Sequence, residues 1–163
     1  MELKTMIYTA ITPALALLPA RMDTAEARVM LLAIGLQESR FTHRQQIGGP
    51  ARGFWQFEKG TRGSRGGVWG VFLHAASKGH LAALCKARSV ACDPDAIYAA
   101  LEYDDVLAAG VARLLLWTDP KALPAIGDAD AGWALYLRTW RPGKPHPKTW
   151  PALYAQAVAA LEA

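Results

Sequence analysis

The amino-acid sequence predicts a mostly α-helical protein with a single domain that covers residues 1–163. The length is that of one domain. Hydrophobic residues make up 52% and charged residues 20% of the chain, which is enough apolar material for a core and too little charge for a disordered chain. Apolar residues recur at helical spacing in several stretches, whereas glycines gather in one segment, residues 48–70.

The N-terminal region contains an apolar stretch, residues 7–20, that ends in small residues and is loosely similar to a secretion signal. Glu2 lies in its leading segment, and Pro13 and Pro19 interrupt it. The stretch is also too short to span a bilayer. We therefore expect a packed N-terminal helix that begins or kinks near Pro13, and no secretion signal.

Residues 23–41 form the clearest predicted helix. Asp23 followed by Glu26 is typical of a capping box that opens a helix. Residues 29–36 are apolar on nearly every face, which predicts a helix buried at the centre of the protein. The helix is expected to end in a polar segment that contains Glu38 and Ser39.

The glycine-rich segment, residues 48–70, predicts loops and a small β-hairpin, because helices tolerate glycine poorly. Its expected anchors are Phe54, Trp55 and Phe57. Helical patterns then resume, with polar helix starts at Asp93 and Asp104. We expect helices over residues 73–87, from residue 93, and over 104–117, 131–140 and 150–163, with a rigid proline-containing loop over 141–147.

Charge and cysteine content narrow the functional classes only slightly. The net charge of +4 and the pI of about 9.2 favour polyanionic partners such as nucleic acid, anionic lipid or the cell wall, with a basic protein that binds none of them as the alternative. Cys85 and Cys92 would lie about 10 Å apart on one continuous helix, too far for a disulfide. A loop between them would permit a bridge, but two reduced thiols are the simpler expectation. Neither cysteines nor histidines show metal-ligand spacing, so we expect no metal site.

Glu38 is the leading candidate for a catalytic residue. Burial against apolar side chains and the negative end of the helix dipole both disfavour a charged carboxylate there, and both raise its pKa. A carboxyl group that holds its proton near neutral pH is what cleavage of a glycosidic bond requires. The alternative interpretation is a structural glutamate paired with Arg40 or Arg44.

Two segments carry a resemblance to a known family: Gln-Glu-Ser-Arg-Phe at residues 37–41 and Pro-Ala-Arg-Gly-Phe-Trp-Gln-Phe at residues 50–57. They resemble the lytic transglycosylases and goose-type lysozymes of the lysozyme superfamily, in which a Glu-Ser pair closes a buried helix and a Gly-Leu-Met-Gln block follows at the spacing of Glu38 and Gln56. The resemblance implies a lysozyme-like domain, closest to phage- or prophage-encoded members, with the groove beside the glycine-rich loops or hairpin. It also implies that Glu38 is the general acid and that substrate-binding residues include Ser39, Gly53, Phe54, Gln56 and Tyr136.

The chain departs from the family pattern in two places. Phe54-Trp55 replaces the usual Leu-Met pair, which makes the expected groove floor bulkier. The later Ala-Tyr-Asn-Ala-Gly block is absent, and Tyr136 is its nearest counterpart. Because sugar rings stack on aromatic side chains, Trp55 and Trp133 are the tryptophans expected to contact substrate.

The resemblance implies cleavage of the β-1,4 bond between N-acetylmuramic acid and N-acetylglucosamine in peptidoglycan, without a cofactor, and two reaction types stay open. In a lytic transglycosylase, one glutamate acts as acid and then as base, and the sugar's own 6-hydroxyl forms a 1,6-anhydro end. A lysozyme instead adds water, usually with a second carboxylate. The candidates for that carboxylate are Glu58, Glu102, Asp104 and Asp105. Glu58 lies just past Gln56, although it could also be a solvated charge beside Lys59 and Arg62.

The expected partner is the peptidoglycan glycan strand, with no nucleic acid and a monomeric protein. Without a secretion signal, the protein would be made in the host cytoplasm and reach the periplasmic wall with a phage holin, as an endolysin, or be carried in the virion. Two other interpretations stay open. One is a non-catalytic phage structural or wall-binding protein that keeps a lysozyme-like fold, and the other is a DNA-binding module that uses the basic residues between Arg40 and Arg65.

Overall fold

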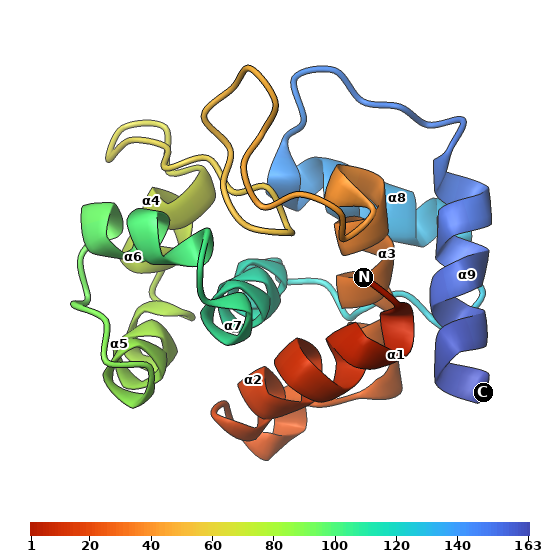
Figure 1. Cartoon of the computed structure of the whole chain (residues 1–163), viewed down its shortest axis with the longest axis horizontal. Helices are drawn as coiled ribbons and strands as arrows, with labels where there is room; N and C mark the ends of the chain where they lie inside the picture. The colour runs from red at the N-terminus through yellow and green to blue at the C-terminus, as the bar shows by residue number, and fades with distance from the viewer.

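The computed structural model describes residues 1–163, and helices joined by loops make up its architecture (Figure 1). This confirms the predicted mostly helical class. A π-helical turn, Ile7–Ile11, joins the first two helices, and a 3-10 turn, Ala20–Met22, precedes the third. The helices are α1 Leu3–Met6, α2 Thr12–Ala16, α3 Ala25–Ser39, α4 Gly67–Leu73, α5 Lys78–Ala87, α6 Pro94–Leu101, α7 Asp105–Trp117, α8 Ala129–Trp140 and α9 Trp150–Glu162.

The N-terminal segment is helical from Leu3 to Ala16, and α2 begins at Thr12 with Pro13 in its first turn, in agreement with the predicted helix that begins or kinks near Pro13. The helical conformation itself already begins at Leu3, well before the proline. Thr9, whose carbonyl the proline ring would meet in a regular α-helix, lies inside the π-helical turn. The wider turn gives the ring room, and the helix continues through it. The stretch packs against α7. None of the helices is both long enough and apolar enough to cross a membrane.

Helix α3 is central, as predicted, and residues 29–36 are all buried. Its N-cap is Thr24, which has an extended backbone and whose hydroxyl accepts a hydrogen bond of 3.1 Å from the backbone N–H three residues later. Asp23 instead forms an ion pair with Arg28 at 2.8 Å. The predicted capping box of Asp23 and Glu26 is therefore wrong.

The C-terminal end of α3 turns sharply, with positive φ angles at Arg40 and Phe41. The ring of Phe41 folds back onto Gly35, where an added Cβ would lie only 2.1 Å from the ring. Glycine at position 35 thus provides the space that the turn needs. Because the chain turns back here, α3 ends directly after Glu38 and Ser39, and the following loop folds beside these last residues.

The glycine-rich segment forms loops only as far as Gly66, because Gly67 already begins α4. The predicted small hairpin reduces to two isolated antiparallel bridges, Gln45 with Arg52 and Arg52 with Phe57. Arg52 takes part in both, so the chain turns again before a ladder can form. The predicted anchors of the loops are buried, as expected: Phe54, Trp55 and Phe57.

The predicted helix starts in the second half are confirmed. The carboxylates of Asp93 and Asp104 accept hydrogen bonds of 3.1 and 2.9 Å from backbone N–H groups in the first turns of α6 and α7. Helix α8 begins slightly earlier than predicted because Asp128 caps it, accepting from a backbone N–H at 3.0 Å. Helix α9 begins at Trp150 and follows the predicted loop over 141–147.

The helix predicted over residues 73–87 is α5, which begins at Lys78 and ends at Ala87 as predicted, because Leu73 belongs to the end of α4 and the residues between them form a turn. The buried hydroxyl of Ser77 donates to the carbonyl of Val71 at 2.7 Å, which holds the chain in a turn between the helices. Further along, Cys85 is buried on α5, Cys92 is exposed in the loop before α6, and both thiols are free.

The hydrophobic core surrounds α3, which packs against α7 and α9. The loops that follow α3 and the loop between α8 and α9 rise on the same side of the molecule, at the top of Figure 1, beside the C-terminal end of α3. Segments far apart in the sequence are thereby brought together around the polar end of the central helix.

Candidate active site

A groove with a volume of about 690 Å³ opens at the C-terminal end of α3. The long connection between α3 and α4 and the loop between α8 and α9 both contribute to it, together with one side of α8. Four residues singled out in the sequence meet in its lining: Glu38, Gln56, Glu58 and Tyr136. The structure thus joins candidate residues from two distant parts of the chain in one concave site.

The carboxyl group of Glu38 is largely buried beneath this groove. Burial raises the pKa of Glu38 from 4.5 to about 7, against a hydrogen bond from Tyr136 that lowers it, while repulsion from Glu58 adds to the increase. The Tyr136 hydroxyl donates to Oε1 of Glu38 at 2.5 Å. Burial and the neighbouring carboxylate also raise the pKa of Tyr136, so its hydroxyl stays a donor. A substantial fraction of Glu38 is therefore protonated near neutral pH.

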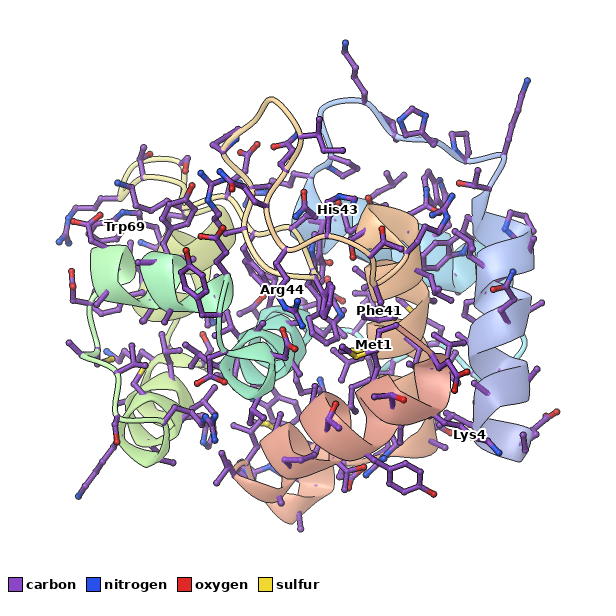
Figure 2. All side chains as sticks on the ribbon, viewed as in Figure 1. Met1, Lys4, Phe41, His43, Arg44 and Trp69 are labelled. Atoms are coloured by element: carbon purple, nitrogen blue, oxygen red, sulfur yellow. The ribbon has the colours of Figure 1, made fainter.

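The interpretation of Glu38 as half of a structural ion pair is contradicted by the positions of both candidate arginines. The Arg40 guanidinium donates to backbone carbonyls of α3. The Arg44 guanidinium binds both carboxylate oxygens of Asp105 at 2.9 Å, between the end of α3 and the start of α7 (Figure 2). Both arginines are thus engaged elsewhere, and the buried Glu38 has a tyrosine rather than a cation as its partner.

Glu58 is exposed in the groove and forms no ion pair. The two cations near it in the sequence interact with other groups. Lys59 pairs with a carboxylate on α6 at 3.0 Å, and the Arg62 guanidinium lies 4.8 Å from the centre of an indole ring on α4. Because repulsion from Glu58 helps to raise the pKa of Glu38, the two carboxyl groups are electrostatically coupled across the same groove.

The other candidate carboxylates have structural roles outside the groove. Asp104 caps α7 and pairs with Arg88 at 2.9 Å. Asp105 pairs with Arg44 at 2.9 Å. Glu102 is the C-cap of α6 and does not line the groove. Glu58 is therefore the second carboxylate that the structure brings to Glu38.

Several residues predicted to bind substrate lie beneath the groove instead of on its surface: Ser39, Gly53, Phe54 and Trp55. The Ser39 hydroxyl donates to the Phe54 carbonyl at 2.6 Å, and the Trp55 indole donates to a carbonyl of α3 at 2.8 Å. Gly53 has a φ of +77°, and an added Cβ would lie 2.8 Å from the Leu101 carbonyl. Ser39, Phe54 and Trp55 thus fasten the loop that carries Gln56 onto α3, and Gly53 lets the loop pass close to the end of α6. All four residues position the site rather than line it.

The side of α8 that faces the groove is aromatic. Tyr136 stacks on Trp150 with 5.6 Å between ring centres and 11° between planes, which fixes its hydroxyl toward Glu38. Trp133 also packs against Trp150 and does not line the groove, contrary to prediction. Trp140 lines it instead, and its indole donates to the Trp55 carbonyl at 2.9 Å. The spacing of Trp140 one helical turn after Tyr136 is the sequence signal that could have identified it.

The loop between α8 and α9, predicted only as a rigid connection, adds Arg141, Lys144 and His146 to the lining. Gln37, next to Glu38, also lines the groove. No group of three His, Cys, Asp or Glu side chains converges in a way that could hold a metal ion. The lining therefore combines carboxyl groups, aromatic rings and cations.

Comparisons of the chain with models of protein families, with curated proteins and with solved structures found no match. The chemistry of the groove is therefore the structural basis for inferring a function. A proton-holding carboxyl group, a second carboxylate and the partly exposed ring of Trp140 in one open groove suit a polymer of sugar rings, whose apolar faces stack on aromatic side chains.

Proposed function

We propose that this chain cleaves the glycan strands of peptidoglycan at the β-1,4 bond between N-acetylmuramic acid and N-acetylglucosamine. The observation that carries the proposal is Glu38, a largely buried carboxyl group with a pKa of about 7 at the floor of an open groove. A general acid works best when its pKa lies near the operating pH, because it then holds its proton and still releases it readily.

Glu38 acts first as the acid. Its Oε1 accepts the hydrogen bond from Tyr136, so the proton that reaches the substrate is carried by the other carboxyl oxygen, Oε2. Transfer of this proton to the glycosidic oxygen makes the departing sugar a neutral alcohol and breaks the bond to the anomeric carbon. The partly exposed ring of Trp140 supplies aromatic surface in the groove against which a sugar ring packs.

Glu58 favours hydrolysis over transglycosylation as the second step. As an unpaired carboxylate in the same groove, it can accept a proton from a water molecule that attacks the anomeric carbon. The product would then be a reducing N-acetylmuramic acid end. A transglycosylase would instead use Glu38 as the base for the sugar's 6-hydroxyl, and Glu58 would be dispensable.

The substrate class comes from the resemblance of residues 37–41 and 50–57 to lytic transglycosylases and goose-type lysozymes. It is supported by the fact that Glu38 and Gln56 line one groove while the residues between them, such as Ser39 and Trp55, hold the two segments together. A phage endolysin or virion-associated lysin, acting as a monomer and delivered to the wall by a holin or by the virion, fits this reaction.

The proposal is tested by the clearance of suspended peptidoglycan sacculi. Wild type is expected to lower the turbidity of the suspension. The rate of clearance by Glu38→Gln should be at least about a hundredfold lower, because the amide cannot donate an acidic proton. Glu162→Gln, a matched change at the exposed end of α9, should clear as wild type does. Undiminished clearance by Glu38→Gln would reject Glu38 as the acid, and sedimentation with intact sacculi without clearance would favour a wall-binding protein.

A further inference from the structure

The side of the groove that is formed by the loop between α8 and α9 is positively charged. We call this side the cationic wall and define it by Arg141 and Lys144. Between Asp130 and Glu162 the chain contains no acidic residue. The basic residues of this segment are Arg138, Arg141, Lys144, His146 and Lys148. Of these, Arg141, Lys144 and His146 line the groove. One side of the site therefore carries two cations, Arg141 and Lys144, and the carboxyl groups of the groove lie on other segments.

The cations of this wall have no carboxylate partner within the protein. Arg138, on the outer side of α8, pairs with Asp119 at 3.0 Å, as do other basic residues of the chain with carboxylates near them. Lys144 is exposed and forms no ion pair. Arg141 donates one hydrogen bond of 3.0 Å to the carbonyl of Ser64 on the facing loop, which leaves its charge uncompensated. Uncompensated cations in a concave site attract an anionic ligand.

The loop is fastened directly beside the catalytic glutamate. The side-chain amide of Gln37 donates to the His146 carbonyl at 3.0 Å, and its oxygen accepts a hydrogen bond from the Thr149 hydroxyl, also at 3.0 Å. Gln37 immediately precedes Glu38. The cationic wall is thus held in register with Glu38 rather than swinging freely in solvent, so that an anion bound there would lie next to the bond being cut.

The sugar backbone of the proposed substrate gives no reason for such a wall, because its acetylated sugars carry no free charge of their own. The stem peptides do, since they hang from each muramic acid and bear free carboxylates. We propose that Arg141 and Lys144 bind the carboxylates of the stem peptides, so that the protein selects strands whose stems carry free carboxyl groups. This proposal rests on the proposed function, because it assigns a second contact of the same substrate.

The test compares two soluble glycan-strand substrates that differ only in stem charge. Both have their stem amines acetylated, and in one the carboxyl groups are converted to amides with carbodiimide and ammonia. Wild type should cleave the carboxylate strands with the higher kcat/KM. In Lys144→Ala, the ratio of kcat/KM on carboxylate strands to kcat/KM on amidated strands should fall about two- to fivefold, through a higher KM for the carboxylate strands. This is the range expected for the loss of one exposed ion pair. Lys148→Ala, a matched exposed lysine of the same loop outside the groove lining, should keep it.

The outcomes separate this proposal from the proposed function. Equal cleavage of both substrates by wild type, or an equal loss of preference in Lys144→Ala and Lys148→Ala, would overturn the stem-peptide site and leave glycan cleavage standing. No cleavage of either substrate by wild type would reject the proposed function itself. Because Lys144 is exposed, both variants should have the circular dichroism spectrum of wild type, and Lys144→Gln provides a second variant that keeps the length of the side chain.

Discussion

Replacing Tyr136 by phenylalanine should move the pH range in which the protein is active. The change removes the hydroxyl that donates to Glu38 Oε1 at 2.5 Å, a hydrogen bond that lowers the pKa of Glu38. A hydrogen bond to a charged group contributes about 1.5–3 kcal/mol, and about 1.4 kcal/mol corresponds to one pH unit, so the pKa should rise by about one to two pH units. Glu38 must be protonated to act as an acid. Activity is therefore lost as the pH rises through this pKa, and the variant should stay active to higher pH.

The assay is the pH dependence of kcat/KM on soluble glycan strands between about pH 5 and pH 10, because this parameter reports the ionisation of the free enzyme. Wild type should show an alkaline limb near the Glu38 pKa of about 7. Tyr154→Phe is the matched control, since that hydroxyl accepts from the backbone of Gly127 at 3.2 Å, away from the groove. An alkaline limb that stays in place in Tyr136→Phe, or moves to lower pH, would refute this account of the site.

Three further predictions concern stability, measured by urea or thermal unfolding. Glu38 binds its proton more tightly in the folded protein, with a pKa of about 7 against 4.5 unfolded, so the free energy of unfolding of wild type should fall by up to about 3 kcal/mol as the pH rises from about 4 to 8. Glu38→Gln should lack this fall, and parallel plots of unfolding free energy against pH for the two proteins would contradict the prediction. Ser39→Ala removes buried hydrogen bonds to two backbone groups and should cost about 2 kcal/mol, whereas a change below about 0.5 kcal/mol would remove Ser39 from its positioning role. Gly35→Ala places a Cβ 2.1 Å from the Phe41 ring and should cost about 1–3 kcal/mol, while Gly79→Ala, with open space around it, should cost nothing; equal effects would contradict the packing argument.

The helices were predictable where local chemistry alone specifies them. Asp93 and Asp104 stand directly before apolar helical patterns, and both are N-caps in the structure. At the start of α3, Asp23 and Thr24 are both capable of capping, and only the backbone angles decide between them. The sequence predicts a helix start or kink near Pro13, but it does not reveal the π-helical turn before the proline that makes room for its ring.

In the candidate site, too, some residues could be identified from the sequence and others could not. Glu38 could be identified because the apolar helix before it ensures its burial, which is the main cause of its raised pKa. Trp133 was predicted to contact substrate, whereas Trp140 lines the groove, because the side of α8 that faces the groove depends on how the helix docks against Trp150. The cationic loop was missed because exposed basic residues look like an ordinary solvated surface until their position beside Glu38 is known.

The most direct test of the central claim, that Glu38 drives the cleavage of glycan strands, is mass spectrometry of the soluble fragments released from purified Gram-negative peptidoglycan. Wild type should release fragments cut at the bond between N-acetylmuramic acid and N-acetylglucosamine, and Glu38→Gln should release none. Reducing muramic ends that disappear in Glu58→Gln would establish hydrolysis with two carboxyl groups, and 1,6-anhydro ends that persist in Glu58→Gln would establish a transglycosylase with one. Glycan fragments released equally by wild type and Glu38→Gln, or by neither protein, would contradict the claim.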